Sequence, residues 1–385
     1  MSASTLPLNK RIKASLRQPK EICSFSIDEN YETQLDNRCL SYFYLPEAFL
    51  DYNIDLSAGF SDFTEKDESI DVHLNHMLKA LLHYEQENDT KVKVDMITFR
   101  GIMTKILCLS YSKNEDLDLN IVRFDNQLFM EEDHDLLMSR KRPMGPRDKM
   151  MSYWGYKFEA VSTLRKPWSE TTRDEIENRS KVPVNNIEQY LSIVRTGIGS
   201  VRLLLGAEVD CVKDYKPEAP KDPLPHYMEL KTSSVIYDEK EARKFERKLF
   251  KTWAQSFLLG VRHIVYGFRD QNGKLESIEH FKTEQLPILV RDSSYTHKNA
   301  KWNGNDSIAF YGAVIEWIKE TIGTTGDDFG TAWRLQFRAG DQQIHLYPLE
   351  GPENEKVLRS LLLPEFVEWR KQRRAQEQEN KPADA

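Results

Sequence analysis

Cysteine is scarce in this sequence. The chain has four cysteines among 385 residues, and no two of them stand in a C-x-x-C spacing. A chain of this length can bury a core without disulfide staples, so we expect reduced, mostly buried thiols and an intracellular protein. Long apolar runs are also missing: no stretch approaches the ~18 residues of a membrane span, and residues 1–7 lack the apolar segment of a signal peptide. The composition therefore argues against membrane proteins and against secreted, disulfide-stapled ones.

An excess of positive charge is missing too. The sequence contains 54 Lys and Arg against 61 Asp and Glu, which gives a net charge of −7. Proteins that coat nucleic acid through charge alone are usually basic, so this class is disfavoured. The balance leaves room for an enzyme that grips one nucleic-acid end in a local basic pocket. Glycine-rich phosphate loops are absent as well: residues 196–200 hold two glycines and are interpreted as a turn.

Strand and helix patterns alternate along the chain. Residues 117–129 alternate around Asp125-Asn126, which predicts a hairpin, and residues 190–195 and 201–212 predict a second one. Residues 239–259 repeat a large apolar side chain every four positions and stop before Gly260, as a helix does. The mixture indicates an α+β (mixed α/β) protein with a mixed sheet and flanking helices. Further expected elements are strands at 227–232 and 263–268, a helix at 69–85, and loops at 138–149 and 213–225.

The two ends of the chain are polar. Residues 1–17 are expected to be a frayed basic N-terminus, and residues 374–385 are expected to be a disordered tail. The folded part is then predicted to span residues 18–373, without a linker or an internal repeat. Two small basic clusters, at 10–13 and 371–374, fit either nuclear import or ordinary solvated surface charge.

Acidic residues in apolar surroundings are the most informative feature. Glu208 and Asp210 interrupt the apolar run 203–212 and stand two positions apart, so they share one face of a strand. Glu229 and Lys231 share a face in the same way. If the two strands pair, three carboxylates and one ammonium converge. Three carboxylates are the usual demand of Mg²⁺ or Mn²⁺, although the same side chains could instead form a structural ion-pair network.

This E-x-D … E-x-K arrangement resembles the PD-(D/E)xK nuclease superfamily, in which acids on paired strands hold a metal and the lysine assists attack on a phosphodiester. A further acid, Glu159, lies in the aromatic run 153–160. It is either a helix-start charge that faces solvent or another ligand. His73 and His76 have an H-x-x-H spacing that could bind zinc, but a third ligand is not evident nearby, so no zinc site is predicted.

Several segments together, and in this order, look like successive motifs of the DXO/Rai family of RNA 5′-end decapping and pyrophosphohydrolase enzymes. The likeness covers residues 18 to 373 and is nearest to the fungal nuclear members. The segments are Ile-Thr-Phe-Arg-Gly at 97–101, Gly-Tyr-Lys-Phe-Glu at 155–159, Gly-Ala-Glu-Val-Asp at 206–210, Glu-Leu-Lys-Thr at 229–232 and Trp-Ala-Gln-Ser-Phe-Leu-Leu-Gly-Val at 253–261.

The resemblance implies a fold and a set of site residues. The fold would be a single domain with two mixed β-sheets flanked by helices around a PD-(D/E)xK-like nuclease core. The site would hold two Mg²⁺ or Mn²⁺ ions. Taken alone, Gln255 could also be a helix-surface amide, and Arg100 a surface ion-pair partner. By resemblance the metal ligands are Glu159, Glu208, Asp210, Glu229 and the carbonyl of Leu230, while Lys231 and Gln255 contact the scissile phosphate or attacking water, and Arg100 holds a 5′-end phosphate.

The resemblance also implies an activity on RNA 5′ ends. Members release pyrophosphate from 5′-triphosphate RNA, remove incompletely methylated caps and NAD-type caps, and some degrade RNA from 5′ to 3′. The fungal nuclear members also bind and stabilise a nuclear 5′–3′ exoribonuclease, which implies a nuclear location. The alternative is a non-catalytic scaffold that only stabilises the exoribonuclease. The intact set of acids favours the enzyme, because a pure scaffold gains nothing from clustered carboxylates.

Overall fold

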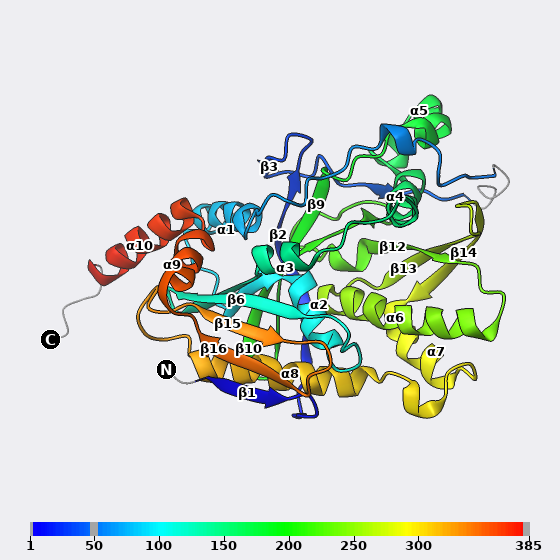
Figure 1. Cartoon of the computed structure of the whole chain (residues 1–385). Coiled ribbons are helices and arrows are strands. Elements are labelled where there is room, and N and C mark those ends of the chain that lie inside the picture. The colour runs from blue at the N-terminus through cyan, green and yellow to red at the C-terminus, as the bar shows by residue number, and fades with distance from the viewer. Residues whose placement is uncertain (1–2, 47–52, 380–385) are drawn as a thin grey trace.

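Two β-sheets form the centre of the molecule (Figure 1). The computed structural model describes residues 3–46 and 53–379. The strands of the first sheet are β1 (Ser4–Pro7), β2 (Leu16–Ile27), β3 (Thr33–Gln34), β5 (Met96–Phe99), β6 (Leu117–Phe124), β7 (Gln127–Glu132), β9 (Gln189–Ile198), β10 (Val201–Glu208), β15 (Trp333–Phe337) and β16 (Gln343–Pro348). Those of the second sheet are β4 (Tyr42–Phe43), β8 (Thr163–Leu164), β11 (Cys211–Val212), β12 (Tyr227–Ser234), β13 (His263–Arg269) and β14 (Leu275–Lys282).

Both sheets are mixed. The first has the order β1-β16-β15-β6-β7-β5-β10-β9-β2-β3, and the second has the order β14-β13-β12-β11-β4-β8. Parallel pairs such as β5–β10 and β12–β13 stand beside antiparallel ones such as β9–β10. The helices are α1 (Asn75–Glu87), α2 (Arg100–Cys108), α3 (His134–Arg140), α4 (Pro146–Val161), α5 (Arg173–Asn178), α6 (Glu239–Leu259), α7 (Leu286–Asp292), α8 (Gly304–Ile322), α9 (Gly351–Ser360) and α10 (Pro364–Glu379). The predicted α+β fold with two mixed sheets is confirmed.

The main hydrophobic core joins α2, α6 and α8 to both sheets. Helix α6 has the predicted bounds because its signals are local. The side chain of Asp238 accepts a hydrogen bond from the backbone N–H of Glu241 at the start, and Gly260 takes a left-handed φ of 85° at the end. Phe245, on the apolar face of this helix, packs against Tyr266 of β13 with ring centroids 5.1 Å apart.

The first predicted hairpin is confirmed. β6 pairs with β7, and the turn residues Asp125 and Asn126 both have positive φ, of 48° and 58°. This is the backbone conformation that two-residue hairpin turns require. The second hairpin, β9–β10, is confirmed as well, with a tighter turn at Gly199 and Ser200.

The predicted single strand over residues 201–212 is wrong, and the difference shapes the site. β10 ends at Glu208, where its ladder with β9 closes at the pair Leu191–Glu208. The backbone N–H of Val209 still bonds to the carbonyl of Tyr190, and the chain then crosses to β11 in the second sheet. Glu208 and Asp210 therefore stand at the passage between two sheets rather than on one strand face.

The ends of the chain are more ordered than predicted. Ser4–Pro7 forms β1, paired with β16, and the Nε of Arg11 lies 2.7 Å from Oδ1 of Asp306 on α8. The predicted disordered tail is helical as far as Glu379, and Arg374 is bonded to Asp328 at 2.6 Å. Both predictions failed because the contacts that order the two ends are distant in sequence. The strand partner of β1 lies more than three hundred residues away, and Asp328 lies 46 residues before Arg374. Residues 1–2 and 380–385 lie outside the described residues.

Two other boundaries also differ. The predicted loop 138–149 is helical at both ends, because α3 continues to Arg140 and α4 begins at Pro146, where proline is well tolerated. The helix predicted from residue 69 begins at Asn75.

The prediction of free, mostly buried cysteines is confirmed. All four cysteines are free; three are buried and Cys23 is half-buried. In residues 3–46 and 53–379, helices long and apolar enough to span a membrane are absent.

Candidate active site

The predicted acids meet where the two sheets come together. Glu159, two residues before the end of α4, Glu208 at the end of β10, and Asp210 in the crossover line one cavity of about 430 Å³. Lys231 of β12 connects this cavity to the fourth acid. Its Nζ lies 3.8 Å from Oδ2 of Asp210 and contacts Oε1 of Glu229. The predicted convergence of three carboxylates and one ammonium is therefore observed, with Glu159 added.

Glu159 is not a helix-start charge. It lies near the C-terminal end of α4, where the helix dipole favours cations, and it faces the other acids. Desolvation by burial raises the pKa of this carboxyl well above its usual range, and repulsion from Asp210 raises it further. When Glu159 is ionised, its buried carboxylate is repelled by the neighbouring acids, and a bound cation would offset this repulsion.

Asp210 is under the same strain. Desolvation and the neighbouring charge of Glu229 raise its pKa to about 7, although Lys231 acts in the opposite direction. Its Oδ2 accepts a hydrogen bond of 2.7 Å from the backbone N–H of Leu230. This bond ties the crossover segment to β12, and so holds Asp210 beside Lys231. The predicted role of the Leu230 carbonyl as a ligand stays a prediction.

Glu229 and Lys231 form the charged pair within the site. Burial on its own would raise the pKa of Glu229, but the charges of Lys231 and Arg100 outweigh it and lower that pKa. Burial would likewise lower the pKa of Lys231, but Glu229 and Asp210 outweigh it and raise that pKa. Glu229 is thus a carboxylate and Lys231 an ammonium throughout the neutral range.

Glu208 is the most accessible of the acids. Its side chain lines the cavity and remains exposed to solvent there. Protein atoms around the carboxyl still withdraw it from bulk water, which raises its pKa despite the charges of Lys231 and Arg100. A hydrogen bond with Gln189 at the start of β9 acts against this rise.

Arg100 lies at the start of α2, and its charge acts on both Glu208 and Glu229. Only 8% of the residue is exposed, and its Nε is buried without a hydrogen-bond partner in the described part of the chain. A buried guanidinium donor without an acceptor is costly, and an anionic ligand would satisfy it. The alternative of a surface ion-pair partner is therefore wrong. The predicted binding of a phosphate by Arg100 fits this environment and remains a prediction.

Gln255 is half-buried on α6, and its predicted contact with the phosphate stays a prediction. The histidine pair does not converge on a common point. Nδ1 of His73 lies 3.0 Å from Oε1 of Glu131, whereas Nδ1 of His76 lies 2.8 Å from Oγ1 of Thr33.

The donor set suits a hard divalent cation. Four carboxylates converge, and three of them have raised pKa values because they are desolvated together. Across the described ranges, no group of three or more His, Cys, Asp or Glu side chains is already placed to hold a metal ion, and the ammonium of Lys231 lies among the acids. Oxygen donors of this type are the ones that Mg²⁺ and Mn²⁺ prefer.

The cavity also contains residues that the sequence did not point to. Tyr156, one turn before Glu159, and Gln189 contribute polar groups to it, and three cations stand on its wall. The cations are Arg165, Lys166 and Arg179. Only Tyr156 lay within a recognised motif. Gln189 begins β9, and the three cations come from the segment around β8 and α5, which the fold brings to the acids and which carries no local signal.

A two-sheet fold whose crossover presents E-x-D beside an E-x-K strand defines a nuclease of the PD-(D/E)XK class. A sequence model described as RAI1 like PD-(D/E)XK nuclease matches residues 17–366. The chain belongs to this family.

Relatives and solved structures agree with this assignment. The chain is 44% identical to the decapping nuclease RAI1 of Debaryomyces hansenii, over 95% of this chain and 97% of that protein. It is 42% identical to the decapping nuclease RAI1 of Candida albicans, over 96% and 98%. The crystal structure of Candida albicans Rai1 in complex with pU5-Mn²⁺ superposes with a TM-score of 0.92 at 41% identity, over 97% of this chain and 100% of that one. Scheffersomyces stipitis Rai1 in complex with (3′-NADP)⁺ and calcium ion gives 0.88 at 41% identity, over 96% and 100%.

Proposed function

We propose that this protein is a metal-dependent decapping nuclease that hydrolyses RNA 5′ ends. The observation that carries the proposal is the convergence of Glu159, Glu208, Asp210 and Glu229 around Lys231 in a member of this nuclease family. The relatives named decapping nuclease, and the neighbour bound to pU5-Mn²⁺, support RNA as the substrate. A scaffold without activity has no use for carboxylates held at raised pKa values.

The substrates we propose are RNAs with a 5′-triphosphate, an incompletely methylated cap or an NAD-type cap. The neighbour bound to (3′-NADP)⁺ supports the last of these. Exonuclease activity from 5′ to 3′ would follow if the same site accepts the RNA left after the first cleavage.

The four acids would hold Mg²⁺ or Mn²⁺, and we propose two ions. When bound, such cations neutralise phosphate charge and lower the pKa of water. Lys231 adds a fixed positive charge where negative charge builds up on the scissile phosphate. Arg100 would bind a terminal phosphate through its unpaired donor, and Gln255 would position the scissile phosphate or the attacking water.

The direct test is a comparison of RNAs that share one sequence and differ only at the 5′ end. The four ends are triphosphate, unmethylated cap, methylated cap and NAD cap, each incubated with Mg²⁺, Mn²⁺ or a chelator. We expect metal-dependent release of pyrophosphate, cap or NAD from the first, second and fourth RNAs. Lack of release from all four with either metal would refute the proposal, and so would release that the chelator does not affect.

We also propose that the protein resides in the nucleus and stabilises a nuclear 5′–3′ exoribonuclease. The support for this part is the likeness to the fungal nuclear members of the family. Co-sedimentation with that exoribonuclease is the expected result, and absence of a complex at micromolar concentrations would contradict it.

A further inference from the structure

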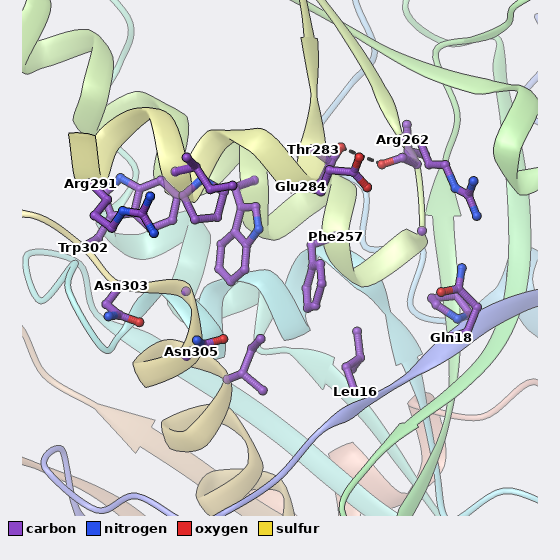
Figure 2. Close-up of a pocket in the computed structure, with 18 of the residues that line it drawn as sticks. Leu16, Gln18, Phe257, Arg262, Thr283, Glu284, Arg291, Trp302, Asn303 and Asn305 are labelled. Atoms are coloured by element: carbon purple, nitrogen blue, oxygen red, sulfur yellow. Dashed lines mark hydrogen bonds between the residues drawn. The ribbon is translucent and has the colours of Figure 1, made fainter. Parts of the chain in front are cut away.

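A second and larger cavity, of about 1060 Å³, lies apart from the carboxylates (Figure 2). None of the residues that line it lines the carboxylate cavity. Its walls are the first residues of β2, the C-terminal end of α6, α7 and the first turn of α8. The carboxylate site does not include this volume, so the chemistry of the larger cavity needs its own explanation.

The cavity is strongly basic in a chain whose net charge is −7. Five cations line it, against a single acid, Glu284. The cations are Arg17, Arg262, Arg291, Lys298 and Lys301. Of these five cations, only Arg291 forms an ion pair with an acid within residues 3–46 and 53–379, and its partner is Asp292. The positive charge at this site is therefore largely uncompensated by the protein itself.

The floor of the cavity is aromatic. Trp253 stacks on Phe257 with ring centroids 5.0 Å apart and on Trp302 at 5.4 Å. The two tryptophans are buried, whereas Phe257 is only half-buried, and its ring points into the cavity in Figure 2. The amides of Gln18 and Asn305 stand exposed at the rim. Cations for phosphates, a ring for stacking and amides for polar edges are the combination that single-stranded nucleic acid requires.

A further cavity, of about 500 Å³, lies between this one and the carboxylates along the next residues of β2. It carries three lysines and three acids, and Nζ of Lys216 lies 3.1 Å from Oε1 of Glu21. Nζ of Lys216 bonds to the hydroxyl of Tyr190, and Tyr190 lines the carboxylate cavity. The three cavities thus follow β2 and its partner strand β9 in sequence.

We propose that the large basic cavity is a second RNA-binding site, which holds a single-stranded segment downstream of the 5′ end. The proposal rests on the proposed function, which places the 5′ end among the carboxylates. An acidic peptide would satisfy the cations but would leave the Phe257 ring and the rim amides unused.

The sheet register sets the length of RNA that can reach both sites. Arg17 of this cavity pairs with Gly197 on β9, eight positions from Gln189 at the carboxylates. Eight residues of strand span roughly 25 Å. At ~3.4 Å per stacked nucleotide, an RNA needs roughly eight nucleotides to cover that distance. A stacked 5-nucleotide RNA covers only about 17 Å of this distance, whereas a 20-nucleotide RNA covers all of it.

The test is the affinity of full-length protein for 5′-phosphorylated oligouridylates of 5 and 20 nucleotides, measured by fluorescence anisotropy with metals chelated. The double variant Arg262→Gln/Lys298→Gln removes two cations from the cavity. The matched control, Arg359→Gln/Lys371→Gln, removes two exposed cations from α9 and α10, on the other side of the molecule from α7 (Figure 1).

We expect the cavity variant to lose about tenfold in affinity for the 20-mer and nothing for the 5-mer. Its salt slope should fall by roughly 1.4, as two lost phosphate contacts require. Equal 20-mer affinities of the cavity variant and the control would overturn the proposal.

A second variant tests the aromatic contribution. Phe257→Leu keeps the apolar volume and loses the stacking surface, so the 20-mer should bind at least about fivefold more weakly while the melting temperature stays close to that of the wild type. Displacement of the 20-mer by polyglutamate as effectively as by oligouridylate would indicate an acidic-peptide site and would also overturn the proposal. Because these measurements need no hydrolysis, they remain decisive if the proposed activity fails. Conversely, the cavity variant should still hydrolyse a triphosphorylated 5-mer at the wild-type rate.

Discussion

At the scale of single residues, the site is held together by charges that would repel one another without Lys231. Asp210 is bonded to the backbone of Leu230, so it cannot move away from Glu159 and Glu229. Because these acids are held close together and desolvated, the pKa values of Glu159, Glu208 and Asp210 are raised, which is typical of functional sites. These residues contribute to function at the expense of the stability of the fold.

The residues of this set were predictable because their signal is local. One alternating pair of acids and one alternating acid–lysine pair in apolar runs, together with ordered motifs, pointed to Glu208, Asp210, Glu229 and Lys231. The structure corrects the geometry: Glu208 ends a strand of one sheet and Glu229 stands in the other. Arg165 and Lys166 could not be predicted, because only the three-dimensional course of the chain brings them to the cavity.

His76 gives a residue-scale prediction about stability. Burial lowers its pKa from 6.5 to about 4, and the charges of Lys79 and Lys66 add to this effect. The unfolded chain takes up the proton near pH 6.5 and the folded chain only near pH 4. Protonation therefore favours unfolding, and the contribution of His76 to stability is lost as the pH falls through this window. The loss should be roughly 2 kcal/mol between pH 7 and pH 5.

The measurement is urea unfolding at both pH values for the wild type, His76→Gln and the control His83→Gln, an exposed histidine on the same helix. The His76 variant should lack about 2 kcal/mol of the pH dependence. If it showed the same pH dependence as the wild type, the burial of a neutral imidazole at this position would be contradicted.

At the scale of elements, α10 shows how a polar helix is fixed to the fold. Arg370 is 1% exposed, and its guanidinium bonds to both carboxylate oxygens of Glu85 on α1 at 2.6 Å. It also bonds to Asp125, in the β6–β7 turn, at 2.7 Å. This one side chain therefore joins the C-terminal helix to the first helix and to the hairpin.

Replacing Arg370 by leucine should leave the buried Glu85 without its cationic partner, with the backbone N–H of Val92 still donating to Oε1. Breaking a buried pair in this way costs roughly 3–5 kcal/mol, so the free energy of unfolding in urea should fall by about that amount. Arg359→Leu on α9 breaks only an exposed i,i+4 pair and should cost less than about 0.5 kcal/mol. Equal stabilities of the two variants would show that the buried contact does not hold α10 in place.

Helices and strands were predicted correctly where the residues that determine their bounds lie within or next to the element in sequence. α6 was predicted with its observed bounds because its cap, apolar face and terminal glycine are all contiguous in sequence. β1 was not, because its order depends on pairing with β16, more than three hundred residues away. The end of β10 was missed for the same reason, since Cys211 and Val212 pair with β12 in the second sheet, which the local sequence does not show.

At the scale of the whole molecule, charge is distributed unevenly. The excess of acids gives a net charge of −7, yet the acids of the site converge at the crossover between the sheets, and five cations line the basic cavity beside a single acid. The negative balance therefore disfavours general coating of RNA and is compatible with a grip on one end. The two sheets matter to function mainly because the chain passes from one to the other at Asp210.

The central claim is that the acids at this crossover carry out hydrolysis of RNA 5′ ends. The most direct measurement is metal-dependent release of pyrophosphate from 5′-triphosphate RNA by the wild type and by Glu208→Ala/Asp210→Ala. The control is Glu276→Gln/Glu279→Gln, which removes two exposed acids from β14. We predict that the site variant loses activity on the order of a thousandfold or more, while it stays folded with a melting temperature no lower than that of the wild type. The control should keep full activity. Undiminished, metal-dependent turnover in the folded site variant would contradict the account.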